Sequence, residues 1–388
     1  MVRRVAARIL QCFVLMLDYV IPKKRNRILV GRQPTGNAGA FFEWLQQSGA
    51  QWDSYFWLTI DSPDLGDFLV KHEGRILRGL SMRNLWIYLR ARVLVSTHGR
   101  LDFHPLLLPS FRTHKMVIQL FHGVPLKAMG WAESSLSPRE ARQECASFRH
   151  YDVVVMPSKT AMQGMITCYN NNPRSYLLSG QPRNDHLVRG VSRREIREML
   201  PDHAVGKRLV LYAPTWRRYA PTQWFPFDDF DRDRLIGFLV EANASILLRG
   251  HEMESANVHA LCDGRNLIDF GAHTCREVND VLPQIDVVVS DYSSIYIDYL
   301  LLDRPCIFLP YDFEEYCAKR SLLVDDYDFW TPGDKPATMA EFIHSLKTAL
   351  DHPAQESEQR QRINRLYNYH QSDNSCERIA EWIESHLR

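Results

Sequence analysis

The sequence predicts an α/β protein of two domains with parallel sheets, and three observations support this class. The chain has 388 residues, which at roughly 100–200 residues per domain indicates two domains. Short β-branched runs alternate with longer amphipathic stretches, as successive βαβ units require. Several of the β-branched runs are almost continuously apolar, which is typical of strands that helices cover on both faces.

The predicted elements follow this alternation along the whole chain. The expected strands are Arg27–Gly31, Ser54–Ile60, Val93–Ser96, Met116–Leu120, Val153–Pro157, Arg208–Ala213, Ser245–Arg249, Leu267–Asp269, Asp286–Ser290 and Cys306–Leu309. Helical spacing of apolar residues predicts helices that include Phe41–Gln47, Met82–Arg92, Asp231–Ala242 and Ile295–Leu302.

Four segments are expected in the domain organisation. Residues 1–26 form a basic helix, residues 27–190 the first α/β domain and residues 191–353 the second. A helix over Arg193–Leu200 is expected to bridge the two domains. Residues 354–388 are helical and charged, and the sequence leaves open whether they cross back to the first domain.

The composition excludes several classes of protein. An apolar fraction of 45% and a charged fraction of 24% are those of a globular protein and not of a disordered or polytopic membrane protein. A formal charge of +1 gives no indication of a nucleic-acid partner. The eight cysteines are scattered singly, which fits a reduced cytosolic compartment.

The N-terminal segment differs from the rest of the chain in its charge. Residues 1–32 hold eight Lys or Arg and only Asp18 as an acid. The apolar stretch Ile9–Ile21 is too short to span a bilayer and is followed by no cleavage site for a signal peptide. We expect an interfacial helix whose basic flanks meet anionic headgroups; an ordinary first helix with a solvated basic flank is the alternative.

His122 follows a predicted strand and stands directly before Gly123. A glycine lets the backbone approach a ligand closely, and a histidine at the carboxyl end of a strand is suited to be a general base near neutral pH. Lys127 lies nearby and is expected to disfavour the imidazolium form of His122. A hydrogen-bonded loop histidine is the alternative. The segment Val95–Pro105, with three further polar residues, is expected near the same strand ends, where it either touches an acceptor or packs as a polar loop; these residues are His98, Asp102 and His104.

Two further loops carry guanidinium groups. Arg183 lies in a turn-forming cluster and either clamps a phosphate bidentately or stands beside residues that cap the next helix. Thr215 and Arg217 follow the strand that begins at Arg208, and their loop suits phosphate contacts and base stacking, with a solvated loop as the alternative. Arg249 and His251 end another strand and, two residues apart, point to the same side, as a pyrophosphate site would need.

The most informative segment runs from a buried strand through Asp291 into a helix. Ser293 and Ser294 precede that helix, whose free N–H groups form an anion site. Asp298 lies one turn beyond Ser294 on the same face. Capping of the helix by the same groups is the alternative. No spacing of His, Cys or acidic residues indicates a metal site.

In this order, the segments resemble the CDP-glycerol glycerophosphotransferase family of teichoic acid primases, polymerases and capsule enzymes. His122–Lys127 looks like its HGTPLK motif, with Val124 in the Thr position. The other matches are Gly180–Asp185 with G-x-PRND, Tyr212–Arg217 with YAPTWR, Arg249–His251 with R-x-H, and Asp291–Ser294, Asp298–Tyr299 and Arg304–Pro305 with DYSS, DY and RP.

The resemblance implies a GT-B architecture, with two Rossmann-like domains facing across a cleft. It implies transfer of glycerol phosphate from CDP-glycerol to a hydroxyl of a lipid-linked or polysaccharide acceptor, with release of CMP. It also implies peripheral attachment to the cytoplasmic face of the cell membrane. No cofactor beyond the CDP-glycerol donor is expected.

The implied site places a base and a set of cations around the donor phosphates. His122 takes the proton of the acceptor hydroxyl, and Arg249 and His251 neutralise the pyrophosphate with Ser293 and Ser294. The other expected donor contacts are Gly123, Lys127, Arg183, Thr215, Arg217, Asp291 and Asp298. Three alternatives stay open: a CDP-ribitol donor, a GT-B glycosyltransferase that uses nucleotide sugars, and a non-catalytic scaffold of an assembly complex.

Overall fold

Two compact units make up the chain in the computed structural model. The structure describes residues 2–49, 51–60, 65–99, 102–104, 107, 114–170, 173–201, 208–217, 219–250 and 258–387, without the side chains of residues 2–8. The N-terminal unit comprises residues 1–123, 129–185 and 374–388, and the C-terminal unit comprises residues 124–128 and 186–373. The α/β class predicted from the alternating pattern is confirmed in both units.

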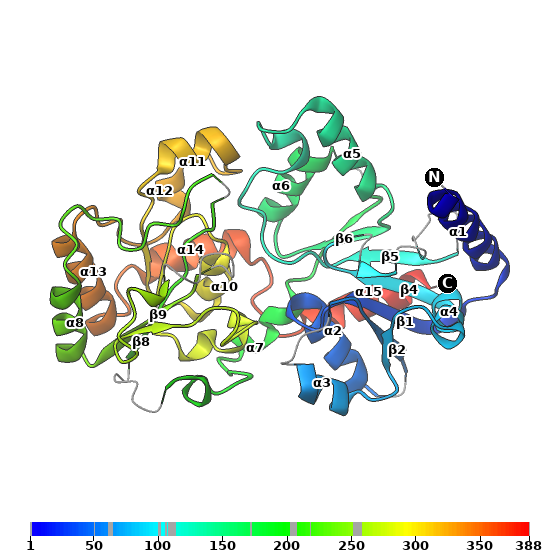
Figure 1. The fold of residues 1–388 in the computed structure, drawn as a ribbon, viewed down its shortest axis with the longest axis horizontal. Coiled ribbons are helices and arrows are strands. Elements are labelled where there is room, and N and C mark those ends of the chain that lie inside the picture. Colours follow the sequence, from blue (N-terminus) through cyan, green and yellow to red (C-terminus); the bar gives the residue numbers. More distant parts are fainter. Residues whose placement is uncertain are drawn as a thin grey trace. The chain divides into compact units, whose positions relative to one another are not determined.

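The N-terminal unit is built on a parallel sheet of seven strands (Figure 1), in the order β3-β2-β1-β4-β5-β6-β7. The strands are β1 (Lys24–Arg32), β2 (Asp53–Leu58), β3 (Ile76–Arg78), β4 (Ala91–Ser96), β5 (Met116–Gln119), β6 (Val153–Met156) and β7 (Tyr176–Leu178). Its helices are α1 (Val2–Val20), α2 (Gly36–Gln47), α3 (Gly66–Lys71), α4 (Met82–Leu89), α5 (Pro138–Phe148), α6 (Lys159–Tyr169) and α15 (Ser375–His386).

The last helix of the chain completes the N-terminal core. Ile379 and Ile383 of α15 are fully buried in the same apolar cluster as Ile28 of β1 and Phe41 of α2. Figure 1 shows α15, in red, beside α2. Asp185 accepts hydrogen bonds from the first backbone N–H groups of α15, which satisfies donors that a helix start leaves unpaired.

The C-terminal unit is built on a parallel sheet of five strands, in the order β10-β9-β8-β11-β12. The strands are β8 (Arg208–Tyr212), β9 (Ala244–Leu248), β10 (Leu267–Asp269), β11 (Val287–Ser290) and β12 (Cys306–Phe308). Its helices are α8 (Arg232–Glu241), α10 (Ile295–Tyr299), α11 (Phe313–Arg320), α12 (Tyr327–Trp330), α13 (Met339–Asp351) and α14 (Ser357–Tyr367), while α7 (Asp185–Val188) spans the boundary between the units.

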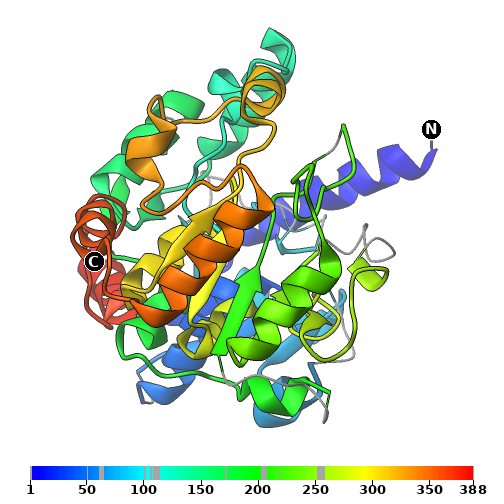
Figure 2. The same ribbon diagram turned by 90° about the vertical axis from the view of Figure 1, so that its left-hand side faces the viewer.

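Helices α8 and α13 cover one face of this second sheet. Figure 2 shows them side by side in front of the strands, α8 in green and α13 in orange. Leu235 of α8 and Phe342 of α13 are fully buried against Val210 of β8 and Ile246 of β9. Leu211 and Leu247, which point to the opposite face, are also fully buried, and burial on both faces explains why the strands read as continuous apolar runs.

The structure corrects three predictions about elements. Met82–Arg92 is not one helix, because α4 ends at Leu89 and β4, paired with β1, begins at Ala91. Arg193–Leu200 forms only a 3₁₀ turn at Ile196–Met199, since its backbone N–H groups bond to Asp280 and Gln284 instead. The predicted helix Ile295–Leu302 changes from α to 3₁₀ geometry after Tyr299.

The N-terminal helix is held to the first sheet by a buried acid. The side chain of Asp18 is 1% exposed and pairs with Lys23 at 2.8 Å and with Lys115 at 2.9 Å. The other side of α1 exposes Ile9, Phe13, Met16 and other large apolar side chains. Within the described residues, none of the helices combines the length and apolarity that crossing a membrane requires.

Candidate active site

Each sheet has one point where its strand order reverses. In the N-terminal unit β1 leads to β2 and β3 on one side, and β4 then returns to the other side of β1. In the C-terminal unit the same reversal lies between β8 and β11. Open parallel sheets bind ligands outside the carboxyl ends of the strands at such points. A ligand site is therefore expected at the loops after β1, β4, β8 and β11.

His122 lies at this edge of the N-terminal sheet, three residues beyond the end of β5. The residue keeps part of its surface open to solvent, and its Nδ1 lies 3.4 Å from the carbonyl oxygen of Thr97. Because a carbonyl can only accept, this contact favours the tautomer with hydrogen on Nδ1. The Nε2 atom then keeps its lone pair, which a general base needs.

A second histidine, His98, lies against His122. The two rings stack with centroids 4.6 Å apart and an interplanar angle of 7°. Burial, the neighbouring ring of His122 and the guanidinium of Arg32 lower the pKa of His98 to about 3. Asp102 fixes the loop of His98, because its carboxylate accepts the backbone N–H of Thr97 at 2.6 Å and of His98 at 2.9 Å.

The electrostatics around His122 favour its neutral form. Burial lowers the pKa of His122, and the cations Arg183 and Arg32 lower it further, against the opposite effect of the Thr97 carbonyl. Arg183 also donates from Nη1 to the carbonyl oxygen of His122 at 3.0 Å. The expected contribution of Lys127 is not among these causes, and Lys127 clusters with the C-terminal unit. The cations that act on His122 are thus Arg183 and Arg32.

Asn37 of α2 ties the His122 loop to the Arg183 loop. Its Nδ2 donates to the carbonyl oxygen of Phe121 at 3.0 Å, and its Oδ1 accepts the backbone N–H of Arg183 at 3.2 Å. Phe121 holds a left-handed backbone with φ of +56°, which costs an L-residue energy unless its surroundings enforce it. The Phe121 N–H is also bonded to Gln119 Oε1 at 3.1 Å. These bonds fix the turn that carries His122 and Gly123.

In the C-terminal unit, Asp291 joins the two strand ends at the reversal point. Its Oδ1 accepts the backbone N–H of Thr215, after β8, at 2.8 Å. The hydroxyl of Thr215 is buried and makes no hydrogen bond in the described structure. Tyr327 donates to the carbonyl oxygen of Asp291 at 2.8 Å. Asp291 therefore shapes the loop edge where a phosphate contact was predicted.

Arg217 lies beneath this edge and is 3% exposed. Its guanidinium donates to Asp312 at 2.5 and 2.7 Å, to Asp291 at 3.0 Å and to the carbonyl oxygen of Thr215 at 2.6 Å. This pairing assigns Arg217 to holding three loops together. Its predicted direct contact with the donor stays a prediction.

Ser293 and Ser294 follow Asp291 and are half-buried. The side chain of Ser294 makes no capping hydrogen bond to α10, so helix capping does not explain Ser294. Asp298, in contrast, is 1% exposed and accepts a hydrogen bond from Asn279 at 3.2 Å. Its burial favours a structural role over donor contact.

Arg249 follows β9 at the same edge of the second sheet. Its guanidinium donates to the carbonyl oxygens of Phe270, Cys275 and Arg276 at 2.7–3.3 Å. Burial lowers its pKa from the ordinary value. The predicted partner His251 lies outside the described residues. Lys127 pairs by a backbone bridge with Leu322, and burial lowers the pKa of Lys127 to about 8.

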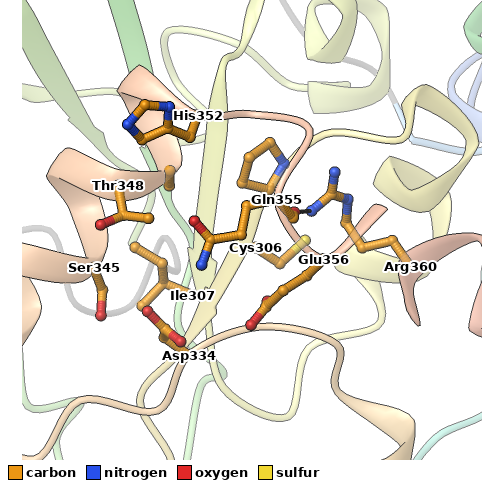
Figure 3. A pocket seen from close by; sticks show the side chains of 11 residues that line it. Cys306, Ile307, Asp334, Ser345, Thr348, His352, Gln355, Glu356 and Arg360 are labelled. Atoms are coloured by element: carbon orange, nitrogen blue, oxygen red, sulfur yellow. Dashed lines mark hydrogen bonds between the residues drawn. The ribbon is translucent and has the colours of Figure 1, made fainter. Parts of the chain in front are cut away.

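One hollow of the C-terminal unit lies away from these residues. Figure 3 shows it beside β12, lined by side chains that include Asp334, Ser345 and Glu356. The lining includes Pro305 and Cys306, at the amino end of β12. The volume of the hollow, about 30 Å³, holds roughly two waters at most. It is therefore no candidate for a nucleotide site. No cluster of three or more metal-ligating side chains was found in the part of the chain that the structure describes.

Two residues of the site were not among the predicted site residues: His98, which stacks on His122, and Asn37, which bonds to both the His122 loop and the Arg183 loop. His98 was placed near the strand ends, but its contact with His122 depends on β4 and β5 being neighbours in the sheet. Asn37 carried no signal, since an asparagine at a helix start is most often a capping residue.

Two parallel α/β units, each with polar loops at the reversal point of its sheet, define a Rossmann-like two-domain fold class. The wall teichoic acid polymerase TagF shares this fold, with a TM-score of 0.75, 19% identity and coverage of 100% of this chain and 96% of TagF. The predicted GT-B fold class is therefore confirmed.

The chain belongs to the CDP-Glycerol:Poly(glycerophosphate) glycerophosphotransferase family, which it matches over residues 14–385. It is 28% identical over 266 residues to the teichoic acid ribitol-phosphate polymerase TarK of Staphylococcus aureus, covering 66% of this chain and 50% of TarK. It is 24% identical over 380 residues to the teichoic acid poly(glycerol phosphate) polymerase of Bacillus spizizenii, covering 93% of each. The chain spans only 40–50% of the length of the three ribitol-phosphate polymerases that it matches.

Proposed function

We propose that this protein transfers glycerol phosphate from CDP-glycerol to a hydroxyl of a membrane-linked or saccharide acceptor and releases CMP. The observation that carries the proposal is His122 at the carboxyl edge of its sheet, where burial first, and Arg183 and Arg32 second, lower its pKa and favour the neutral form. Family membership supports the donor. A TagF variant has been soaked with CDPG, which supports the same donor class.

In the proposed reaction the acceptor oxygen attacks the phosphorus that bears glycerol. A new P–O bond forms, the P–O bond to the CMP phosphate breaks, and Nε2 of His122 takes the acceptor proton. Phosphoryl transfer needs positioning and charge neutralisation more than covalent chemistry. We assign neutralisation to Arg249 and His251, with Ser293, Ser294 and Thr215 donating hydrogen bonds. No cofactor beyond the donor is part of this proposal.

The proposed setting is the cytoplasmic face of the cell membrane, with peripheral attachment. The exposed apolar side of α1 supports contact with an anionic membrane surface. Three of the cations that follow α1 form ion pairs within the protein: Lys23 pairs with Asp18, while Lys24 and Arg27 pair with Asp53. Contact with headgroups therefore depends on the other basic residues, such as the exposed Arg25.

A CDP-ribitol donor is the second candidate. Three relatives at 27–28% identity are named as ribitol-phosphate polymerases, whereas the relative that matches most of the chain is a glycerol-phosphate polymerase. The two donors differ only in the length of the polyol, so direct comparison decides between them.

The test is thermal stabilisation and CMP release with CDP-glycerol, CDP-ribitol and a UDP-sugar. A ligand that binds the folded protein at a hundredfold excess over its Kd raises the melting temperature of a domain of this size by roughly 5–10 °C. We expect the largest shift with CDP-glycerol, and a smaller shift after Ser293→Ala with Ser294→Ala. The control Ser345→Ala changes a serine of α13 that lines the hollow beside β12, away from these residues. Stabilisation by the UDP-sugar alone would contradict the proposal.

A further inference from the structure

A cavity of about 340 Å³ opens beside His122 in the N-terminal unit. This volume lies in the range of small-molecule sites, about 300–1,000 Å³. The loops after β4 and β5 contribute His98 and His122 to its lining, and helices α5 and α6 contribute Phe148 and Tyr169. The cavity is therefore next to the proposed base, and all the described residues that line it belong to the N-terminal unit.

Aromatic rings form one wall of this cavity. Phe148 stacks on Tyr169 with centroids 3.7 Å apart and an angle of 16°, and Tyr151 meets Phe148 edge-on at 5.3 Å. All three side chains are more than nine-tenths buried. Packing against each other holds the rings in place, so a ligand meets a preformed apolar wall with polar tips.

The polar groups of the cavity include a single carboxylate. Glu144 is half-buried and accepts a hydrogen bond from the Tyr169 hydroxyl at 3.1 Å. The hydroxyl of Tyr151 accepts from Gln119 at 3.1 Å. Among the described residues that line the cavity, none is Lys or Arg, and the two histidines have lowered pKa values.

The single carboxylate and the absence of Lys and Arg among the described lining residues decide which chemical groups the cavity can bind. A phosphate placed there would meet the Glu144 carboxylate within the lining, whereas the cations that act on the two histidines, Arg32 and Arg183, lie outside the lining, and this opposes binding of an anion beside Glu144. Hydroxyl groups, in contrast, can donate to the carboxylate and to the tyrosine oxygens, and a charged acceptor strengthens such hydrogen bonds. An aromatic wall with surrounding acceptors suits a ring that is apolar on its face and polar on its rim.

We infer that this cavity binds a neutral saccharide ring of the acceptor and so presents its hydroxyl to His122. The inference rests on the proposed function for the role of the acceptor. According to this inference, the part of the acceptor that lies next to His122 is an uncharged sugar and not a chain of polyol phosphates. Binding of the sugar itself requires neither donor nor turnover, and this separates the two proposals experimentally.

The first experiment measures binding to the full chain by saturation-transfer NMR. The probes are maltose, cellobiose and N,N′-diacetylchitobiose as neutral sugars, and sn-glycerol 3-phosphate and a glycerol phosphate trimer as anions. We expect a signal from at least one neutral sugar and none from the anions. Ser147→Trp, which fills the cavity from α5, is expected to abolish the signal.

The second experiment tests Glu144 with the sugar that binds. Glu144→Gln removes the charge but keeps the shape, and we expect at least a tenfold weaker affinity for the sugar. The matched control Gln143→Ala alters an exposed neighbour on the same helix and is expected to bind normally. Stabilisation by CDP-glycerol is measured in the wild-type protein and in each variant: its absence in the wild-type protein counts against the proposed function and not against the cavity, and its retention in the variants shows that they are folded.

Three results would overturn the inference. One is binding of the glycerol phosphate trimer that Ser147→Trp abolishes. Another is the absence of a signal from every neutral sugar while the protein remains folded by circular dichroism. The last is sugar binding that neither Ser147→Trp nor Glu144→Gln changes, which would place the sugar elsewhere on the protein.

Discussion

At the scale of single residues, the structure explains how a histidine with an ordinary pKa near 6.5 is prepared to act as a base. His122 keeps access to solvent at the loop edge, while partial burial of its imidazole, together with Arg183 and Arg32, opposes its protonation. The contact of Nδ1 with the Thr97 carbonyl leaves Nε2 as the accepting atom. The same loop edge holds a second neutral histidine, His98, whose stacking restricts the ring of His122.

The pH dependence of transfer follows from these shifts. The neutral form of His122 is active, so kcat/KM falls with decreasing pH only below its lowered pKa, that is, below the ordinary value for histidine. Arg183→Gln removes a cation that opposes protonation, and we expect the acidic limb to move to higher pH. The measurement is kcat/KM between about pH 5 and about pH 8, with Arg174→Gln as the control.

An acidic limb that stays in place in Arg183→Gln, or one that moves to lower pH, contradicts this electrostatic account. If Arg183→Gln also lowers kcat/KM at all pH values while the acidic limb stays in place, the electrostatic role of Arg183 is still contradicted. That result assigns Arg183 to donor contact and leaves the pKa of His122 to burial and Arg32.

Some of these residues could be found from sequence and others could not. His122 and Asp291–Ser294 were predicted because each follows an apolar strand directly and neighbours a turn or helix start. Lys127 was expected beside His122 because the two are close in sequence, yet the chain passes from one unit to the other at Gly123 and Val124. The stacking of His98 depends on a strand order that local patterns do not contain.

At the scale of elements, loops after three neighbouring strands meet at one buried guanidinium. Arg217, after β8, is bonded to Asp291, after β11, and to Asp312, after β12. A buried charge pair contributes little net stability, but the removal of one partner leaves the others uncompensated. The edge that carries Thr215, Ser293 and Ser294 thus depends on Arg217 for its shape.

We expect Arg217→Ala to destabilise the protein by about 3–5 kcal/mol, because Asp291 and Asp312 lose their cation. Arg217→Lys keeps the charge but cannot form the two parallel bonds to Asp312, so we expect an intermediate loss. The measurement is denaturant unfolding, with the exposed Arg234→Ala on α8 as the control.

A loss in Arg217→Ala no larger than that in Arg234→Ala contradicts the structural role. If stability is kept and affinity for CDP-glycerol is lost, Arg217 contacts the donor directly, as the sequence motif had indicated.

Strands that are buried along their whole length were predictable, whereas two partly exposed edge strands were not. Strands such as Val287–Ser290 and Cys306–Phe308 matched within one residue, because buried apolar runs end at polar turns. The edge strands Ile76–Arg78 and Tyr176–Leu178 escaped prediction, since they are only partly buried and so lack the continuous, fully buried apolar run of a covered strand. The predicted helix Arg193–Leu200 failed because tertiary hydrogen bonds replaced helical ones.

At the scale of the whole molecule, α1 combines an internal anchor with an apolar outer side. Asp18 interrupts the apolar sequence because it is the residue that faces the protein, buried with Lys23 and Lys115. Burial lowers the pKa of Lys115 to about 7. The exposed fractions of Phe13 and Met16 are 51% and 56%, so the helix presents apolar side chains in a fixed orientation.

We expect Phe13→Ser with Met16→Ser to weaken binding to anionic lipid vesicles by tenfold or more, since each side chain loses about 1.5–3 kcal/mol of apolar burial. The measurement is co-sedimentation with vesicles of phosphatidylglycerol. The control is Val70→Ser with Met82→Ser, which removes two exposed apolar side chains from α3 and α4. Equal binding by both double variants, or no binding by the wild-type protein, contradicts a role of α1 at the membrane.

The central claim is that His122 is the base for transfer of glycerol phosphate, and one measurement tests it most directly. CMP release from CDP-glycerol is measured with a purified acceptor for the wild-type protein, His122→Ala and the exposed control His344→Ala. Thermal stabilisation by the donor is followed in parallel. The account predicts that His122→Ala lowers the rate by about 10²–10⁴-fold while donor stabilisation and the fold are kept. A rate near that of the wild-type protein in His122→Ala would contradict it.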